Sequence, residues 1–353
     1  MNEIIADSLP DSKQAALITS EVGRRYVTGF KSSSGVVVVT KEKSYFLTDS
    51  RYYEKAAETV KDFKVVLLNE LKEHLEYIFM KHGIETVSVE NKTVTLAEFE
   101  KYKKMFPQTE FDASPWLSDL IIKKRAVKSA SELKKIETAQ RLAERAFGKL
   151  ITKLKAGVTE KQVAAVLNYY MMELGADGAA FPTIAASGKN SAVPHAAPTD
   201  KPLENGDFLI IDFGASVDGY SSDMTRTVVV GKPTENMKRV YDAVWSANTD
   251  ALKAIRAGVT GKLLDNVARS TLEAWGYENF FGHSLGHGVG LEVHEAPALS
   301  AKSDSTLKEG MVLTVEPGVY IPHKFGVRIE DMAVVTKNGC VNLTKTPKTL
   351  IRV

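Results

Sequence analysis

The chain has 353 residues, of which 44% are hydrophobic and 25% charged, the composition of a soluble globular protein long enough for two domains. Its 46 basic and 44 acidic side chains leave a net charge of +2, so electrostatics give no general reason to expect nucleic acid or a membrane as partner. No apolar run is long enough to span a membrane, and the N-terminal stretch lacks the features of a signal peptide. The single cysteine, Cys340, fits a cytoplasmic location and is expected to be a small buried residue rather than a nucleophile.

The first 125 residues alternate between strand-like and helix-like segments. β-rich runs at Gly35–Thr40 and Ser44–Asp49 are separated by a polar turn, and Ser50–Val60 is predicted to be a helix. A strand in "FKVVLL" and a helix that ends at Gly83 follow. This alternation predicts an α/β domain.

A domain boundary is predicted near Ala126–Lys128. The segment "KSASELKKI" that follows offers Ser129 as a helix N-cap, with Glu132 three residues later in the pattern of a capping box. We expect a long amphipathic helix from there to about Lys155 and divide the chain into residues 1–125 and 126–353.

The second part of the chain repeats itself. "AGVTEKQVAAVLNYYMMELGA", from Ala156, resembles "AGVTGKLLDNVARSTLEAWGY", from Ala257, at an offset of 101 residues. "VPHAAP" matches "EVHEAP" and pairs His195 with His294, at an offset of 99. "GDFLIIDFG" matches "GMVLTVEPG" at an offset of 104, and "SSDMTRTVVVG" corresponds loosely to "VRIEDMAVVTKNG". Four matches in the same order predict two homologous half-domains of helices and antiparallel strands that face each other across a pseudo-twofold axis.

The repeat places acids at equivalent positions in both halves. Asp212 and Glu316 end the apolar runs "FLII" and "VLTV", and Asp223 and Glu330 follow further along each half. A buried carboxylate is costly unless it is paired or binds a cation, and four converging carboxylates would repel one another. Because carboxylates can bridge two cations roughly 3.5 Å apart, the arrangement predicts a site for one or two divalent metal ions.

Three of the seven histidines fall in "GHSLGHGVGLEVHE". His294 has a repeat mate in His195, whereas His287 has none, so His287 is the candidate for a fifth, symmetry-breaking metal ligand. Its neighbouring glycines would let the backbone approach the metal, and they argue against a helical pairing of His283 with His287. Oxygen-rich ligands with one imidazole suit Mn²⁺, Co²⁺, Fe²⁺ or Zn²⁺, and the sequence does not choose among them. The HExxH and P-loop motifs are missing.

These residues resemble the methionine aminopeptidase/prolidase superfamily, whose catalytic domain has the "pita-bread" fold. "SGKNSAVPHA", "GHGVGLEVHE", "TVEPGVY" and "VRIED" match its motifs over residues 126–353, and "YVTGF" and "LTDSRYYEKA" resemble the creatinase/prolidase-type N-terminal domain. The resemblance implies an α/β (α+β) protein, with a creatinase-type α/β domain at 1–125 and a pita-bread metallopeptidase domain with an internal pseudo-twofold repeat at 126–353.

The resemblance also implies a role for each metal ligand. Asp212 would chelate one metal, Asp223 and Glu330 would bridge both, and His287 and Glu316 would complete the second. A metal-bridging water with a lowered pKa would be the nucleophile, and Glu316 would shuttle its proton.

Further residues are expected to handle the substrate. His195 and His294 would bind it and either stabilise the tetrahedral intermediate or move a proton to the leaving nitrogen. By resemblance, His283 would lie beside the proline or carboxylate end of the substrate, and Arg328 would support the site and hold a carboxylate. Two aromatic candidates for the pocket walls are Phe181 and Tyr220.

The leading interpretation is metal-dependent hydrolysis of an Xaa-Pro peptide bond, because the N-terminal domain favours the proline-specific branch of the superfamily. The compact length and the "GHGVGLEVHE" run favour an Xaa-Pro dipeptidase (prolidase) acting on short proline-containing peptides. An Xaa-Pro aminopeptidase (aminopeptidase P) acting on longer peptides is the alternative, and a non-catalytic binding module is the alternative from another class. The resemblance further implies two metal ions, with Mn²⁺ or Co²⁺ preferred, and a homodimer.

Overall fold

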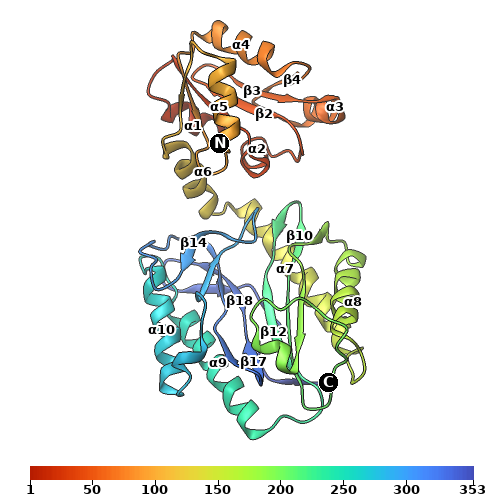
Figure 1. Cartoon of the computed structure of the whole chain (residues 1–353). Coiled ribbons are helices and arrows are strands. Elements are labelled where there is room, and N and C mark those ends of the chain that lie inside the picture. Colours follow the sequence, from red (N-terminus) through yellow and green to blue (C-terminus); the bar gives the residue numbers. More distant parts are fainter. The chain divides into compact units, whose positions relative to one another are not determined.

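The structure is a computed structural model of residues 1–353, and it divides into two compact units, Met1–Arg125 and Ala126–Val353 (Figure 1). Each unit has its own sheets and its own hydrophobic core. None of the helices combines the length and the apolar composition that a membrane crossing requires.

The first unit is built on a mixed six-stranded sheet with the order β4-β3-β2-β1-β5-β6. Its strands are β1 (Gln14–Ile18), β2 (Val36–Thr40), β3 (Ser44–Thr48), β4 (Lys64–Leu67), β5 (Thr86–Val89) and β6 (Glu110–Asp112). Its helices are α1 (Asn2–Ser8), α2 (Glu21–Thr28), α3 (Ser50–Thr59), α4 (Leu71–His82), α5 (Leu96–Met105) and α6 (Trp116–Ala126). The strands and helices expected between residues 35 and 83 are confirmed, and α4 ends at Gly83 in the left-handed conformation, with φ 58°.

Alternating side chains of β2 supply two cores, one on each face of this sheet. Val36 and Val38 pack on the face that α4 and α5 cover, and Val37 and Val39 pack against Ile5 on the other face. An unbroken valine run therefore marks a strand that is buried on both faces.

The second unit contains the long helix that the capping box predicted. Ser129 accepts from the Glu132 N–H, and the Glu132 side chain accepts from the Ser129 N–H, at the start of α7 (Ala130–Ile151). The helix ends four residues before the expected Lys155, because the chain turns at Thr152 and brings Leu154 into the core. The other helices of this unit are α8 (Glu160–Glu173), α9 (Glu235–Ala254), α10 (Gly261–Ala274) and the short 3₁₀ helices η1 (Gly188–Ala192) and η2 (Glu278–Phe280).

Two main sheets lie between these helices. The first has the order β20-β12-β9-β8, with β8 (Ile184–Ser187), β9 (Phe208–Phe213), β12 (Met224–Val229) and β20 (Ile351–Arg352). The second has the order β14-β13-β15-β18-β19, with β13 (Gly286–Gly288), β14 (Glu295–Leu299), β15 (Val312–Val315), β18 (Asp331–Val335) and β19 (Cys340–Asn342). Short strands β7 (Gly178–Ala179), β10 (Ala215–Val217) and β11 (Tyr220–Ser221) form a third sheet, and β16 (Gly318–Ile321) pairs with β17 (Phe325–Arg328).

The internal repeat is visible in the arrangement of these elements. Thr159 caps α8 and Thr260 caps α10, and each half continues into an antiparallel strand pair, β9–β12 in one and β15–β18 in the other. Figure 1 shows α7 and α8 on one side of the strands and α9 and α10 on the other. The expectation of two similar half-domains is confirmed by this arrangement, which brings the acid-bearing strands together in the middle of the unit.

Candidate metal centre and active site

The two central strand pairs present four carboxylates in a related way. Asp212 lies on β9 and Glu316 directly follows β15, while Asp223 directly precedes β12 and Glu330 directly precedes β18. The Glu330 N–H donates to the Thr225 carbonyl at 3.1 Å, which joins the two strand pairs at the site. The acids thus meet where the two halves contact each other.

His287 reaches the same place from the short strand β13. A Cβ atom at Gly286 would lie 2.2 Å from the Thr314 carbonyl oxygen, and one at Gly288 would lie 2.2 Å from the Ala296 carbonyl oxygen. The flanking glycines therefore make room for the neighbouring strands, rather than for a metal ion as the sequence suggested. As expected, this segment is not helical.

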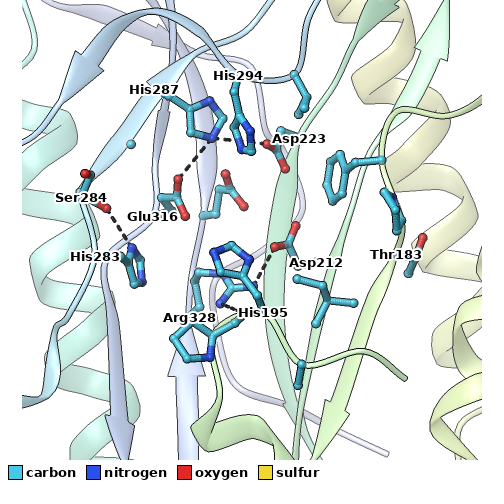
Figure 2. A pocket seen from close by; sticks show the side chains of 18 of the residues that line it. Thr183, His195, Asp212, Asp223, His283, Ser284, His287, His294, Glu316 and Arg328 are labelled. Atoms are coloured by element: carbon cyan, nitrogen blue, oxygen red, sulfur yellow. Dashed lines mark hydrogen bonds and ion pairs between the residues drawn. The ribbon is translucent and has the colours of Figure 1, made fainter. Parts of the chain in front are cut away.

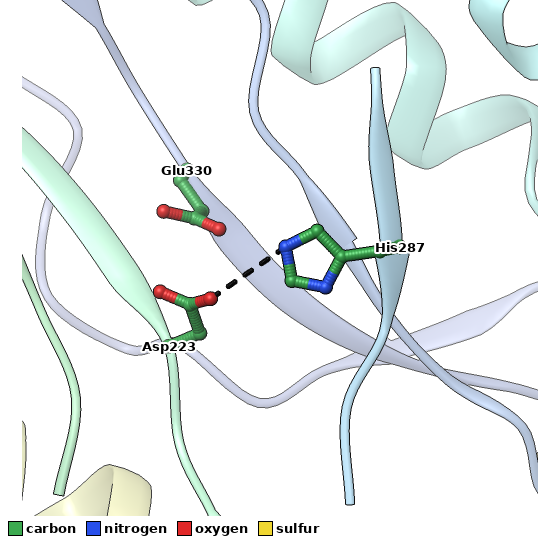
Figure 3. A group of neighbouring side chains, drawn as sticks. All are labelled: Asp223, His287 and Glu330. Carbon is green, nitrogen blue, oxygen red and sulfur yellow. Dashed lines mark ion pairs between the residues drawn. The ribbon is translucent and has the colours of Figure 1, made fainter. Parts of the chain in front are cut away.

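The His287 ring has one nitrogen tied to the backbone and the other turned towards the acids. Nδ1 lies 3.1 Å from the Gly288 carbonyl oxygen, so Nδ1 carries a proton that it donates. Nε2 lies 3.3 Å from Glu316 Oε1 and 3.7 Å from Asp223 Oδ2. Potential ligand atoms of Asp223, His287 and Glu330 all lie within 4.8 Å of one another (Figure 3). Metal-binding imidazoles usually donate one ring N–H to a backbone carbonyl in this way, which orients the ring and leaves the other nitrogen available for the metal.

Without a cation, the burial and mutual repulsion of the carboxylates are unfavourable. Burial, then repulsion from neighbouring carboxylates, raises the pKa of Asp223 and of Glu330 well above the ordinary range, and burial also raises the pKa of Asp212. Asp212 Oδ1 and Asp223 Oδ1 are buried without any hydrogen-bond partner. Such orphaned oxygens are costly in a protein interior, and a divalent cation would satisfy them, so the residues present fit a metal centre.

Glu316 differs from the other three acids. Burial pushes its pKa upwards, but the hydrogen bond and charge of His287, together with His283 and Arg328, outweigh burial and hold the pKa below its ordinary value. The reciprocal interaction raises the pKa of His287 against the effect of burial. Glu316 is therefore the acid of this group that stays ionised most readily.

A cavity of about 580 Å³ opens in front of the carboxylates (Figure 2). Much of its wall is apolar, as is typical of small-molecule sites. The apolar part of the wall includes Phe181, Pro182, Ile184, Pro194, Pro198 and Val293. The polar part consists mainly of the acids, Arg328 and four histidines, His195, His283, His287 and His294.

The repeat-related histidines both line this cavity and come from corresponding segments of the two halves. His195 lies in an irregular segment after η1, and His294 lies immediately before β14. The His294 ring stands perpendicular to the His287 ring, with 4.3 Å between centroids. Burial, followed by the charge of His287, lowers the pKa of His294, which favours a neutral ring.

His283 lines the cavity but has both ring nitrogens engaged. Nδ1 donates to the Ser284 carbonyl at 2.9 Å, so Nε2 accepts from the Tyr320 hydroxyl, also at 2.9 Å. Burial lowers the pKa of His283 and raises that of Tyr320 to about 12, which keeps both groups neutral. His283 therefore offers the cavity a ring face rather than a free nitrogen.

Arg328 supports the site from behind, and its guanidinium is already occupied by the protein. Four of its five N–H groups donate, to the Thr225 hydroxyl at 3.1 Å, the Pro194 carbonyl at 3.2 Å, the Tyr320 hydroxyl at 2.7 Å and Asp212 Oδ2 at 2.7 Å. The residue is only 2% exposed. In this geometry Arg328 binds Asp212, Tyr320 and the Pro194 carbonyl together, and one N–H group is left for a substrate.

The two aromatic candidates have different outcomes. Phe181 is among the residues that line the cavity, whereas Tyr220 is not. The Tyr220 side chain packs against Ile136 and Val289, and its hydroxyl donates to Glu132 at 2.8 Å, because β11 turns this side chain towards α7.

Several residues at the site were missed. Tyr320, Thr225 and Thr314 bind Arg328, Glu330 and Glu316 through their hydroxyls. Only their positions in the sequence could have identified them: Tyr320 ends the motif "TVEPGVY", and both threonines lie on the acid-bearing strands. Cys340 lies outside the cavity; it is half-buried, and burial raises the pKa of its thiol, which does not suit a nucleophile.

Comparison with known proteins decides the family. Residues 134–337 match the model of metallopeptidase family M24, and residues 11–122 match the creatinase/prolidase N-terminal domain. The chain belongs to metallopeptidase family M24. The expected superfamily, the metallopeptidase class and the α/β fold with a creatinase-type domain before a pita-bread domain are therefore confirmed.

Several known proteins are similar to this chain over almost their whole lengths. An Xaa-Pro dipeptidase of Pyrococcus horikoshii is 39% identical over 97% of this chain and 95% of its own. The crystal structure of an X-Pro aminopeptidase from Thermotoga maritima is 41% identical, with a TM-score of 0.91 over 96% of this chain and 97% of that one. The structure of an Xaa-Pro dipeptidase from Bacillus anthracis is 39% identical, with a TM-score of 0.93 over 96% and 95%.

Proposed function

We propose that this M24 metallopeptidase hydrolyses the Xaa-Pro bond of short peptides and acts foremost as an Xaa-Pro dipeptidase. The observation that carries the proposal is a pair of orphaned, buried carboxylate oxygens, on Asp212 and Asp223, in a largely apolar cavity that four histidines also line. The relatives named Xaa-Pro dipeptidase, at 38–39% identity, support this choice of substrate.

We propose that residues 1–125 form the creatinase/prolidase-type domain and that residues 126–353 form the catalytic domain, in which five side chains hold two divalent cations. The residues that would hold these ions are Asp212, Asp223, His287, Glu316 and Glu330. The bound ions would polarise the scissile carbonyl and lower the pKa of the attacking water. Mn²⁺ or Co²⁺ is the proposed metal, because the family resemblance favours these two among the ions that four carboxylates and one imidazole suit.

Glu316 is proposed to move the proton of the attacking water. Its lowered pKa keeps it ionised and able to accept a proton, and the Thr314 hydroxyl donates to its Oε1 at 3.3 Å and orients it. The proton must finally reach the proline nitrogen, because an amide nitrogen leaves poorly without one.

His195 and His294 are proposed to act on the substrate rather than on the metal. Both line the cavity beside the acids (Figure 2). The lowered pKa of His294 keeps its ring neutral near pH 7, so the ring can donate an N–H to the developing oxyanion. The apolar wall, including Phe181 and Pro182, offers the dry contact surface that a proline ring requires.

A second candidate function is Xaa-Pro aminopeptidase activity on longer peptides, and one observation favours it. Arg328 is the only Arg or Lys of the cavity wall, and four of its five N–H groups are used within the protein. Within this chain, the free carboxylate of a dipeptide would therefore meet histidines rather than a free guanidinium. The relative from Thermotoga maritima carries the aminopeptidase name. A non-catalytic binding module is disfavoured because the ligand set is complete.

The two peptidase activities are separated by comparing Ala-Pro, Ala-Pro-Ala and Ala-Pro-amide as substrates in the presence of Mn²⁺ or Co²⁺. A dipeptidase releases proline from Ala-Pro at a much higher kcat/KM than it shows with the two extended or amidated peptides. Equal or faster cleavage of Ala-Pro-Ala would support the aminopeptidase. No turnover of any of the three would refute the proposed function.

We also propose a homodimer in the cytoplasm. The dimer rests on the family resemblance, and the compartment is supported by the single cysteine of the chain. Light scattering of the purified full chain and fractionation of cells test the two proposals.

A further inference from the structure

The two repeat-related histidines of the cavity are held by different means. His294 directly precedes β14 (Glu295–Leu299), whose pairing with β13 fixes its backbone. His195 lies in residues 193–201, which belong to no helix or strand. The next residue, Pro202, forms an isolated β-bridge with Thr159. The His195 ring itself makes no hydrogen bond to the protein, so the backbone of this loop must set its position.

A fully buried glutamate outside the cavity binds this loop. Glu160 is the first residue of α8 and is 0% exposed. Its Oε1 accepts from the Ser187 N–H at 2.6 Å and the Ser187 hydroxyl at 2.8 Å. Its Oε2 accepts from the Thr199 N–H at 3.0 Å and the Thr199 hydroxyl at 2.6 Å. The Asn190 amide donates to both oxygens at 3.1 Å.

The partners of Glu160 bracket His195 in the sequence. Ser187 ends β8 before the loop, and Thr199 follows the segment that lines the cavity. One carboxylate therefore joins the two ends of the loop, which reduces the conformational freedom that an irregular segment otherwise has. Between these ends, the Pro194 carbonyl accepts from Arg328 at 3.2 Å, which adds one support on the cavity side.

The charge of Glu160 matches this task. Burial raises its pKa, but the hydrogen bonds from Thr199 and Ser187 outweigh burial and lower it. All of its partners donate, so an ionised carboxylate satisfies them and a glutamine would direct an NH₂ group at an N–H donor. A single isosteric change therefore breaks one end of the clamp without creating a cavity.

The second half of the repeat has no such carboxylate. Gly261 occupies the equivalent first position of α10, and its N–H donates to the Ser305 carbonyl at 3.1 Å, just as the Glu160 N–H donates to the Lys201 carbonyl at 3.2 Å. A Cβ atom at Gly261 would lie 2.3 Å from the Ala298 carbonyl oxygen, so no side chain fits there. The backbone arrangement is shared, and a carboxylate stands at this helix position only in the half whose histidine lacks a strand.

We propose that Glu160 is a positioning residue that fixes the loop of His195 and acts on the reaction through that histidine. The inference rests on the proposed function, because the kinetic role of His195 is part of that proposal. Glu160 also orders the loop between Ser187 and Thr199 when no substrate is bound.

The test compares Glu160→Gln with a matched control, Glu90→Gln. Glu90 is likewise a buried glutamate, 4% exposed, that accepts from the Thr19 N–H at 2.8 Å, the Ser20 N–H at 3.0 Å and the Ser20 hydroxyl at 2.7 Å, but it lies in the first unit. Hydrogen exchange of residues 187–199 is measured on the full metal-loaded chain, together with kcat and KM for Ala-Pro. Both variants are also combined with His195→Ala.

We expect faster exchange of residues 187–199 in Glu160→Gln only, and a fall in kcat/KM of about 10- to 100-fold that lies mainly in kcat. In the His195→Ala background, Glu160→Gln should have no further effect, because a residue that acts through His195 loses its influence with it. The proposal would be overturned if Glu160→Gln lowered kcat/KM by the same factor in the His195→Ala background as in the wild type. Unchanged hydrogen exchange of residues 187–199 in Glu160→Gln would also overturn it.

A milder variant covers the case in which Glu160→Gln does not fold. Thr199→Val removes one hydroxyl donor to the carboxylate and should change exchange and kcat in the same direction by a smaller factor. If the wild-type chain hydrolyses no Xaa-Pro peptide, the proposed function fails, while the exchange measurement still decides whether Glu160 holds the loop.

Discussion

Thr225 joins a proposed metal ligand to the arginine behind the site, and replacing it by valine tests how the centre is supported. The hydroxyl donates to Glu330 Oε2 at 2.7 Å and accepts from Arg328 Nε at 3.1 Å, and the residue is fully buried on β12. Valine has nearly the same shape and suits a strand, so Thr225→Val removes these two hydrogen bonds with little change in packing.

The expected cost follows from the two bonds. The bond to the Arg328 guanidinium involves a charged group and contributes about 1.5–3 kcal/mol. The raised pKa of Glu330 makes the other bond closer to a neutral one, about 0.5–1.5 kcal/mol, in the metal-free protein. Together they give about 2–4.5 kcal/mol, or at least about 4 °C in the Tm of the second unit. Because Thr225 orients a ligand, metal affinity should also fall about 10- to 100-fold.

Calorimetry of EDTA-treated protein and metal titration measure these two effects. Thr227→Val is the matched control, because Thr227 lies on the same strand, is 1% exposed and exchanges hydrogen bonds only with the Arg328 backbone, at 2.9 and 3.1 Å. The control should lower Tm and leave metal affinity within about threefold. The reasoning is refuted if Thr225→Val binds metal as tightly as the wild type, or if both variants weaken metal binding equally.

Two further predictions concern the histidines and pH. His287→Ala should lose most of its bound metal, whereas His294→Ala should keep it and lose at least about 100-fold in kcat, as metal analysis and peptide hydrolysis will show; full metal occupancy in His287→Ala would contradict the ligand assignment. In the metal-free protein, the raised pKa values of Asp212, Asp223 and Glu330 mean that folding favours the protonated acids, so their contribution to stability is lost as pH rises through the folded-state values. The Tm of EDTA-treated protein should therefore fall as pH rises through these raised pKa values, while added Mn²⁺ should raise Tm more at the higher pH; a metal-induced Tm gain that shrinks with pH would argue against metal binding by these acids.

The internal repeat explains why much of the site could be predicted from the sequence. The repeat compares each half with the other, so an acid at the end of an apolar strand stood out in both halves, and His287 stood out because it has no counterpart. The structure brings these side chains together, and the comparisons confirm the family and the fold.

The supporting residues could not be found in this way, because their roles depend on contacts between distant segments. In the sequence, Glu160 is indistinguishable from an ordinary acidic residue in the first turn of a helix. Only the folded chain shows that its carboxylate accepts hydrogen bonds from Ser187 and Thr199. The direction of the Tyr220 side chain could not be predicted either, because a two-residue strand gives no reliable register.

The stoichiometry of bound metal tests the central claim most directly. Equilibrium dialysis of the full chain against Mn²⁺ or Co²⁺, followed by elemental analysis, should give two ions per chain for the wild type. Asp223→Asn should give fewer, because the substitution removes the charge of a proposed ligand whose Oδ1 has no other partner. A wild-type chain that retains no ion, or an Asp223→Asn chain that retains two, would contradict the account.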